Sequence, residues 1–469
     1  MTARRFKPAL ASLATVALLP WAAPAALGPR YGGELVVGVA ELPEALDPDV
    51  PQGASEGLLA GLVHETLLAS GPDGVPTPRL ARTWASAAGG REWTLRLAED
   101  AAFHGGQPVA ASDAVRSLRR FLRSASPAAQ RFAETLEGGL AYRARSSEEL
   151  AGLVMVDDAL TLRLVEAVPL PLAPLSATAA AITSASGAGA GPFAPTAYLP
   201  GKSRLLTAFG AHLSGRPYLD QVQLLASSAS EGAEAALQAG RVGLLPRVGR
   251  TPDSCLGGIL LLILDPSRPP FDRPAARSAV AAALHSPDLV KHLLPGGEAS
   301  PSLLPSSLLP PLGLGTSPVR AALGGQVVMA VSREVPHLVS QRIVAYLSEA
   351  GLAVTAEAGS PRQVLTAKVP LRLVLMSPEV AEPGLALREL AGLAPPVPSA
   401  QEALRAADSE PGLDRRRIHL HRAEAALRSS FTLIPLAAVP LGYAARPGLH
   451  GVLLDLRGRL LLEDAWLEP

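Results

Sequence analysis

Runs of apolar residues separated by turn-forming residues divide the chain into alternating strands and helices. The segment 32–40 (GGELVVGVA) predicts a buried strand, because an aliphatic run follows two glycines. The segment 56–69 predicts a helix, since Leu58 and Leu62 repeat at helical spacing. From residue 92, Trp93, Leu95 and Leu97 alternate with polar residues, which is typical of a half-buried strand. The first hundred residues therefore indicate a mixed α/β protein.

The same patterns continue through the rest of the chain. Residues 326–332, 334–351 and 352–358 predict a strand, a helix ended by Gly351 and a second strand, which together form a βαβ unit. Further strands are predicted at 159–171, 216–226, 257–266 and 369–376, and a strand broken by prolines is predicted at 431–444. Further helices are predicted at 231–239, 273–294 with a break near Ser286 and Pro287, and 414–430.

The stretch FHGGQPVAASDAV, residues 103–115, predicts the end of a strand, a Gly-Gly turn and the start of a helix that continues to Leu122. Ala110 stands at the N-cap position, where it offers no side-chain oxygen, and Asp113 stands at the third helical position. Arg116, Arg119, Arg120 and Arg123 form a basic face on this helix. A solvated surface and an anion site are the two interpretations of that face.

The N-terminus has the pattern of a secretory signal peptide over residues 1–25. A basic start with three positive charges precedes an apolar run that extends to Leu27, and Ala23-Pro24-Ala25 provides a small-residue cleavage site. A membrane anchor helix is the alternative, but two prolines interrupt the apolar run. No cysteine lies near the cleavage site, so we expect a periplasmic protein without a lipid anchor.

Composition and charge exclude several classes of function. The 469 residues are 48% hydrophobic, which is enough for two or three domains. Cleavage of the signal peptide removes three of the 42 basic residues and none of the 42 acidic ones, so the mature chain carries a net charge of −3. A nucleic-acid partner requires a basic surface and is therefore not expected. Cys255 is the only cysteine, which excludes an intramolecular disulfide, and we expect a monomer.

No motif predicts catalysis, a metal site or a cofactor. Gly53-Ala54-Ser55-Glu56-Gly57 fits the pattern of a hydrolase nucleophile, but the preceding DPDVPQ is a turn and not the strand that such a serine needs. His419 and His421 are two residues apart on a predicted helix and point in different directions. The sequence contains neither a Walker A motif nor a dinucleotide-binding glycine motif. These observations favour a binding protein over an enzyme.

The order of eight short segments resembles the family 5 extracellular solute-binding proteins of ABC transporters, which include dipeptide-, oligopeptide- and nickel-binding proteins. The segments are GGELVVGV with LDP, LVHETLLASGPDGVPTPRLARTW, EWTLRLAEDAAFHGGQPVAASDAV, AGPFAPTAYLPG, GRPYLDQV, ALQAGRVGLLP, PPFDRPAARSAVAAAL and LIPL. Each segment alone is a weak signal, whereas eight in the same order cover nearly the whole mature chain.

The resemblance implies a two-lobed α/β periplasmic binding protein of type II, similar to cluster C, with mixed sheets, an inserted domain and a ligand cleft between the lobes. We expect the following parts: the signal peptide 1–25; the first lobe in three pieces, 26–52, 161–250 and 438–469; the inserted domain 53–160; and the second lobe 251–437. Closure around the ligand is expected to create the surface that ABC permease subunits in the inner membrane recognise.

The resemblance also implies a ligand-binding site. Peptide-binding members hold the free amine of the ligand with an aspartate that follows a tryptophan-containing strand; here Met376 takes the place of the tryptophan and Glu379 that of the aspartate. We therefore expect Glu379, Met376 and Ser377 in the site, with Glu379 as the amine anchor; a surface glutamate in a loop is the alternative. Backbone groups of the loop Gln52, Gly53 and Ala54 are expected to contact the ligand.

Three departures from the family pattern leave the ligand open. The tryptophan is missing, Phe209-Gly-Ala-His212-Leu213 replaces an aromatic motif, and Gly243 replaces an acidic residue. Arg277 matches a family arginine, for which an anchoring ion pair is expected rather than ligand contact. The hypothesis is capture of a peptide or related solute for an ABC importer. The alternatives are a sensor or accessory subunit with altered or no ligand, and an exported serine hydrolase acting through Ser55.

Overall fold

The computed structural model describes residues 28–49, 53–71, 75–226, 230–299, 302–312 and 317–468. The predicted signal peptide and Gln52 lie outside these residues. Among the described helices, none combines the length and the apolar character that crossing a membrane requires.

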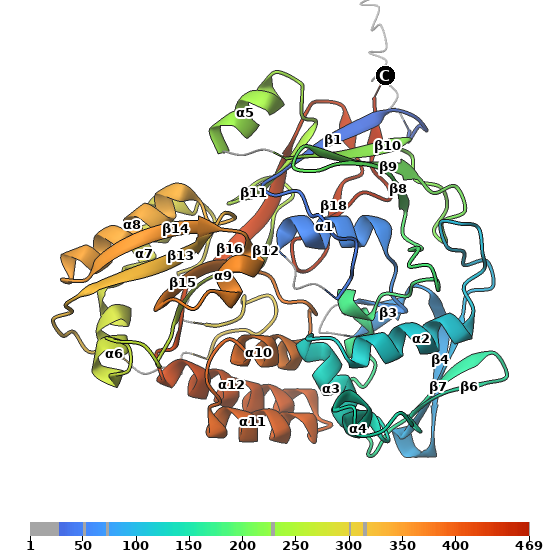
Figure 1. Cartoon of the computed structure of the whole chain (residues 1–469), viewed down its shortest axis with the longest axis horizontal. Helices are drawn as coiled ribbons and strands as arrows, with labels where there is room; N and C mark the ends of the chain where they lie inside the picture. The colour runs from blue at the N-terminus through green and yellow to red at the C-terminus, as the bar shows by residue number, and fades with distance from the viewer. Residues whose placement is uncertain are drawn as a thin grey trace, which may run out of the picture.

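A ten-stranded mixed sheet runs through the molecule and forms its frame (Figure 1). Its strand order is β14-β13-β15-β12-β16-β11-β1-β10-β9-β8. The bounds of these strands are β1 Glu34–Val39, β8 Phe193–Leu199, β9 Ser203–Ala208, β10 Gln221–Ala226, β11 Leu244–Val248, β12 Cys255–Leu264, β13 Gln326–Ser332, β14 Ala353–Gly359, β15 Leu371–Met376 and β16 Leu433–Ala445. β1 lies parallel to β10 and β11, whereas β12 and β16 pair antiparallel. The mixed α/β fold is therefore confirmed.

The strand β16 is continuous, so the prediction of a strand broken by prolines is wrong. A proline lacks the N–H that a central strand donates to its neighbour. The pairing of β12 with β16 has two register shifts, one between Leu260 and Leu261 and one between Leu256 and Gly258. The first lies opposite Pro435 and the second opposite Pro440. The irregular pairing accommodates both prolines without ending the strand.

Twelve α-helices are found among the described residues. α1 is Ala54–Val63, α2 Ala111–Leu122, α3 Pro127–Thr135, α4 Gly139–Arg143 and α5 Ser230–Gln238. α6 is Pro274–Ala283, α7 Ser286–Leu293, α8 His337–Glu349, α9 Pro361–Thr366, α10 Pro383–Ala391, α11 Pro398–Asp408 and α12 Leu413–Ser429. The predicted βαβ unit is β13, α8 and β14, whose strands pair in parallel. The predicted break between two helices is the start of α7 at Ser286.

A four-stranded antiparallel sheet lies beside the main sheet, in the order β4-β5-β7-β6. Its strands are β4 Ala81–Ala87, β5 Glu92–Leu97, β6 Leu153–Val156 and β7 Ala159–Arg163. α2, α3 and α4 pack against it around buried Phe103, Phe121 and Phe132. The predicted helix over 56–69 is shorter than expected: α1 ends at Val63, and residues Leu68–Ser70 form the strand β2, which pairs with β3, Pro76–Pro78.

The basic face of α2 is neither a fully solvated surface nor an open anion site. Arg120 donates to the carbonyl oxygens of Ala179 and Ala181 at 3.1 and 2.8 Å, and Arg116 donates to that of Thr183. These bonds attach the buried segment 177–183 to the helix. The arginines therefore hold a loop of small residues in place.

Candidate functional site

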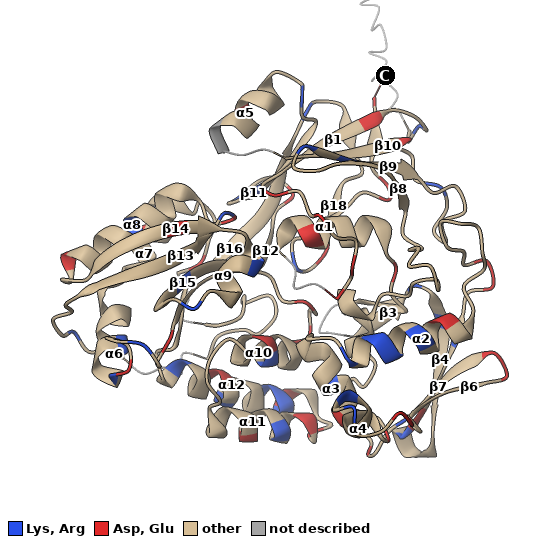
Figure 2. Cartoon of the chain, viewed as in Figure 1, with Lys and Arg blue, Asp and Glu red and all other residues tan. Residues whose placement is uncertain are grey.

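The candidate site is the surface where residues 255–429, which we call the distal part, meet the other described residues, which we call the proximal part. β12 and the returning strand β16 join the two parts within one sheet (Figure 1). Figure 2 shows charged residues gathered where α3 of the proximal part faces α10, α11 and α12 of the distal part. Two glutamates of the distal part accept hydrogen bonds from residues of the proximal part across this surface.

The first interaction between the two parts is the Glu334 contact, formed by Glu334, Gly53, Ala54 and Glu56. Glu334 follows β13, and its Oε1 accepts a hydrogen bond from the backbone N of Ala54 at 2.6 Å. Ala54 is the first residue of α1, so a distal carboxylate lies at the positive end of a proximal helix. Glu56 Oε2 accepts from the backbone N of Gly53 at 3.1 Å. Two carboxylates therefore share one helix N-terminus.

Gly53 is required in the Glu334 contact because of space and not because of its backbone angles. Its φ of −78° suits any residue. A Cβ on Gly53 would lie 2.6 Å from Pro361 Cγ, 2.7 Å from Glu334 Oε1 and 2.9 Å from Glu56 Oε2. A side chain at this position would therefore displace Pro361 and the two carboxylates from the contact.

The second interaction between the two parts is the Glu379 contact, formed by Glu379, Ser126, Ala179, Glu389 and Arg457. Glu379 follows β15, and its Oε2 accepts from Ser126 Oγ at 2.6 Å. Ser126 is the N-cap of α3, where its Oγ accepts from the backbone N of Ala128 at 3.1 Å. Burial raises the pKa of the Glu379 carboxyl, while the bond from Ser126 opposes that shift. The glutamate is thus bonded to the chain itself.

Backbone groups of Glu379 complete this contact. Its N–H donates to Glu389 Oε2 at 2.8 Å, and its carbonyl accepts from Arg457 Nη1. Arg457 also donates to Asp455 Oδ2, at 2.8 Å from Nη2. Burial and the neighbouring Glu379 raise the pKa of Glu389 to about 8. Both carboxyl pKa values are therefore raised, and this pair binds a proton more readily than an exposed pair would.

Apolar and ionic contacts also join the two parts. Val380 and Leu385 of the distal part are 2% and 6% exposed and belong to the apolar core of the proximal four-stranded sheet. Arg131 of α3 and Arg388 of α10 both pair with Asp408, Arg131 at 3.5 Å. A cavity beside these residues has a volume of about 20 Å³, which is room for a single water molecule.

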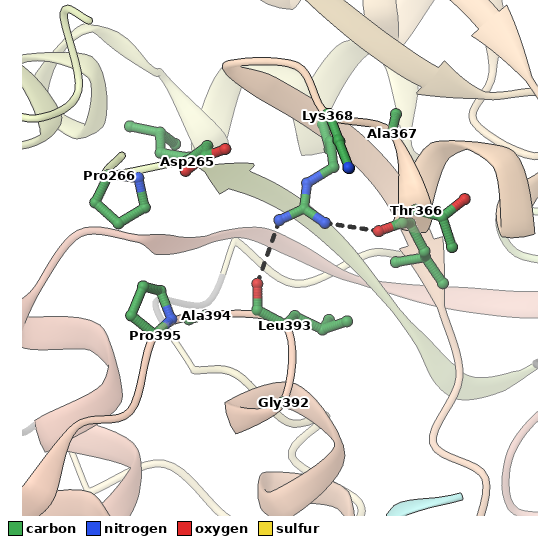
Figure 3. A pocket seen from close by; sticks show the side chains of 12 residues that line it. Asp265, Pro266, Thr366, Ala367, Lys368, Gly392, Leu393, Ala394 and Pro395 are labelled. Atoms are coloured by element: carbon green, nitrogen blue, oxygen red, sulfur yellow. Dashed lines mark hydrogen bonds between the residues drawn. The ribbon is translucent and has the colours of Figure 1, made fainter. Parts of the chain in front are cut away.

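A larger cavity of about 250 Å³ lies elsewhere, at the outer end of β12 and β15 (Figure 3). Asp265, Lys368 and Leu393 line it, and the Leu393 carbonyl accepts from Arg372 at 3.3 Å. Leu371 begins β15 here, and Met376 ends it at the Glu379 contact, roughly 17 Å away at the usual rise of a strand. This cavity is therefore separate from the surface between the two parts.

The structure places the predicted site residues in two groups. Glu379 lies between the two parts, with Met376 at the end of β15 and Ser377 half-buried after it. Gly53 and Ala54 belong to the Glu334 contact, and Gln52 lies outside the described residues. Sequence reasoning did not identify Glu334, Ser126 or Glu389. The one local signal was the serine-proline pair at 126 and 127, which is typical of a helix start.

Two further candidates have structural positions. Ser55 is buried in the first turn of α1, and the described residues before it, 40–49 and Gly53, form no strand of the kind that a nucleophile elbow needs. Arg277 donates to the carbonyl oxygens of Ser430 and Phe271, both at 2.8 Å, and thereby connects α6 to the end of α12. Within the described part of the chain, no group of three His, Cys, Asp or Glu side chains could hold a metal ion.

Comparison with known families gives one match. The model of the bacterial extracellular solute-binding proteins, family 5 Middle, matches residues 75–318. Two curated periplasmic oligopeptide-binding proteins OppA are similar over 86 residues: that of Haemophilus influenzae is 33% identical and that of Escherichia coli is 36% identical. The aligned segment spans 18% of this chain and 16% of each relative.

Solved structures share the fold over most of the chain. The murein tripeptide binding protein MppA of Escherichia coli superposes with a TM-score of 0.80 and 16% identity, covering 92% of this chain and 98% of MppA. The periplasmic binding protein DppA of Helicobacter pylori, in complex with the peptide STSA, gives 0.77 and 15%, covering 94% and 99%. NikA of Staphylococcus aureus, with Ni(L-His)2, gives 0.76 and 11%, covering 93% and 100%. The fold is thus that of the two-lobed periplasmic binding proteins.

Proposed function

Because the chain belongs to family 5 of the bacterial extracellular solute-binding proteins, we propose that it is the substrate-binding subunit of an ABC importer. It captures a peptide or a related small solute between its two parts, delivers it to permease subunits in the inner membrane and catalyses no reaction. The observation that carries this proposal is the family match to residues 75–318 within a fold that superposes on MppA over 92% of the chain.

The proposal includes an exported, periplasmic protein divided as the sequence predicts. The first-lobe pieces 26–52, 161–250 and 438–469, the inserted domain 53–160 and the second lobe 251–437 remain proposals. The buried contacts of Leu58 and Leu62 with β1 favour a later start of the inserted domain, after α1. For Arg277 we propose a structural role, in which it connects α6 to the end of α12.

We propose Glu379 as the group that binds the free amine of a ligand. In this structure its carboxylate accepts from Ser126 Oγ at 2.6 Å and from the backbone N of Ala179 at 3.4 Å. An ammonium group offers the same kind of donor with a full positive charge, and a charge-assisted bond is about twice as strong as a neutral one. A ligand that separates the two parts can therefore replace Ser126 at Glu379.

Isothermal titration calorimetry tests this function. Trialanine and acetyl-trialanine form a matched pair that differs in the free amine, and a pool of di- to pentapeptides covers ligand length. We expect binding of free peptides, weaker binding of the acetylated one, and loss of that difference in Glu379→Gln. Glu357→Gln changes an exposed glutamate of β14 and serves as the control. A folded protein that binds no peptide, nickel chelate or opine-like solute contradicts the import function.

The direct contacts between the two parts favour a second candidate, a sensor or accessory subunit that docks to a membrane partner without tight ligand binding. A cavity of about 20 Å³ is far below the 300–1,000 Å³ typical of small-molecule pockets. Neighbouring genes for a permease and an ATPase support the importer, whereas a neighbouring receptor kinase supports the sensor. Titrations without heat for any ligand, together with an intact fold, favour the sensor.

A further inference from the structure

The Glu334 contact contains two carboxylates that face one another across the boundary between the two parts. Glu334 Oε1 and Glu56 Oε2 lie 2.7 and 2.9 Å from the point that a Cβ on Gly53 would occupy, so both oxygens converge on one backbone position. Glu334 comes from the distal part and Glu56 from the first turn of α1. Separation of the two parts therefore moves these two carboxylates apart.

The charged groups around the Glu334 contact do not neutralise it. Glu41, after β1, faces Glu334 and forms an ion pair with Arg333 at 3.7 Å. Arg362 of α9 acts on Glu56 and lowers its pKa, but burial dominates and raises that pKa overall. Burial, Glu56 and Glu41 raise the pKa of Glu334 to about 7, against the bond from the backbone N of Ala54.

The Glu379 contact also contains two neighbouring carboxylates, but both of them belong to the distal part. Glu379 and Glu389 meet at the boundary, and Asp49 of the proximal part adds a further negative charge near Glu379. The one cation that acts on both glutamates is Arg457, whose guanidinium is already paired with Asp455. Both contacts therefore place pairs of carboxylates where closing of the two parts removes water.

We propose that closure of the distal part onto the proximal part takes up protons, so that the Glu334 and Glu379 contacts form a latch that is closed in acid and released as the pH rises. The proposal concerns the ligand-free chain and rests on the proposed function only in that the two parts open and close. Proton uptake follows because two neighbouring carboxylates that closure takes partly out of water cost less free energy when one of them is neutral.

The direction of the pH effect follows from the raised pKa values. A carboxyl whose pKa is higher in the closed than in the open state stabilises closure fully below its ordinary pKa of 4.5. That contribution is lost as the pH rises through about 7 for Glu334 and about 8 for Glu389. Loss of one proton per group lowers the closure constant by at most about tenfold per pH unit. Because these side chains are half-buried, screening by water reduces the expected change to a few-fold per unit.

Pulsed electron paramagnetic resonance on the ligand-free protein tests the latch. Spin labels are attached at Lys202→Cys in the proximal part and Glu357→Cys in the distal part, both exposed, after replacement of the native cysteine by Cys255→Ser. We expect one short distance at pH 5 and a growing population of longer distances up to pH 8.5. Far-UV circular dichroism at each pH verifies that the chain stays folded.

Variants distinguish a proton latch from a general effect of pH. Glu334→Gln combined with Glu389→Gln removes both titrating groups, so the short distance should persist at pH 8.5. Glu402→Gln, an exposed glutamate of α11, should retain the wild-type response. Distances in the wild type that do not change between pH 5 and 8.5, or a wild-type response in the double variant, overturn the proposal. Neither result depends on ligand binding, which the calorimetry tests separately.

Discussion

The Glu334 contact and the Glu379 contact use one interaction in two different surroundings. In each, a glutamate that follows a strand of the distal part reaches the start of a proximal helix, α1 or α3. The Glu379 contact continues into an apolar core through Val380 and Leu385, whereas the Glu334 contact lies beside the half-buried ion pair of Glu41 and Arg333. The apolar neighbours add a contribution to closure that does not depend on pH, whereas the Glu334 contact has no such core beside it and depends mainly on its carboxylates.

The largest expected loss of stability comes from breaking the buried ion pair of Arg416 with Glu382, which lies three residues after Glu379. Arg416 Nη1 lies 2.7 Å from Glu382 Oε1, and the two side chains are 8% and 3% exposed. Arg416→Met leaves the Glu382 carboxylate buried without this partner, so we expect a loss of about 3 kcal/mol in the free energy of unfolding. Chemical denaturation measures this change. Arg415→Met, at an exposed arginine, is the control and should cost less than about 0.5 kcal/mol.

Ser126 both caps α3 and donates to Glu379, and a comparison of Ser126→Ala with Ser360→Ala distinguishes these two roles. Ser126→Ala removes the cap of α3 and the hydroxyl that donates to Glu379, so we expect a loss of about 2 kcal/mol. Ser360→Ala removes the cap of α9, which lies within the distal part, and should cost about 1 kcal/mol. Equal losses in thermal denaturation would show that the Glu379 contact adds no stability.

Gly53→Ala tests the close approach at the Glu334 contact. The new Cβ would collide with Pro361 and Glu334, so we expect closure to weaken by about 1–2 kcal/mol and the radius of gyration in small-angle X-ray scattering to increase. Gly61→Ala lies in the middle of the same helix, where a Cβ meets no atom within 4 Å. It should stabilise α1 by about 1 kcal/mol without changing the shape. A Gly53→Ala protein with unchanged dimensions would contradict the tight contact.

The sequence predicted the elements of the two contacts better than the contacts themselves. Periodicity located β1, β15 and the βαβ unit around α8, because alternating or helical spacing is a local property. The resemblance to family 5 placed Glu379 in the region between the lobes. Glu334 was not predicted, because its bond to Ala54 joins residues 280 positions apart and exists only once the sheet has positioned both parts. The prolines of β16 misled the prediction because register shifts depend on the partner strand.

The N-terminus of α2 gives the smallest expected effect and tests whether the carboxylates at the starts of α1 and α3 govern closure. α2 begins after Ala110, which receives no distal carboxylate; its backbone N donates to Asp113 Oδ2 at 3.1 Å, but Ala110 offers no oxygen in return. Its φ of −101° and ψ of 159° suit an N-cap serine. Ala110→Ser should therefore stabilise the protein by about 0.5–1 kcal/mol in thermal denaturation, with Ala151→Ser in an exposed turn as the control. Because α2 does not contribute its N-terminus to either contact, the pH dependence of closure should stay as in the wild type. A changed pH dependence would mean that helix stability, and not the carboxylates that cross between the parts, governs closure.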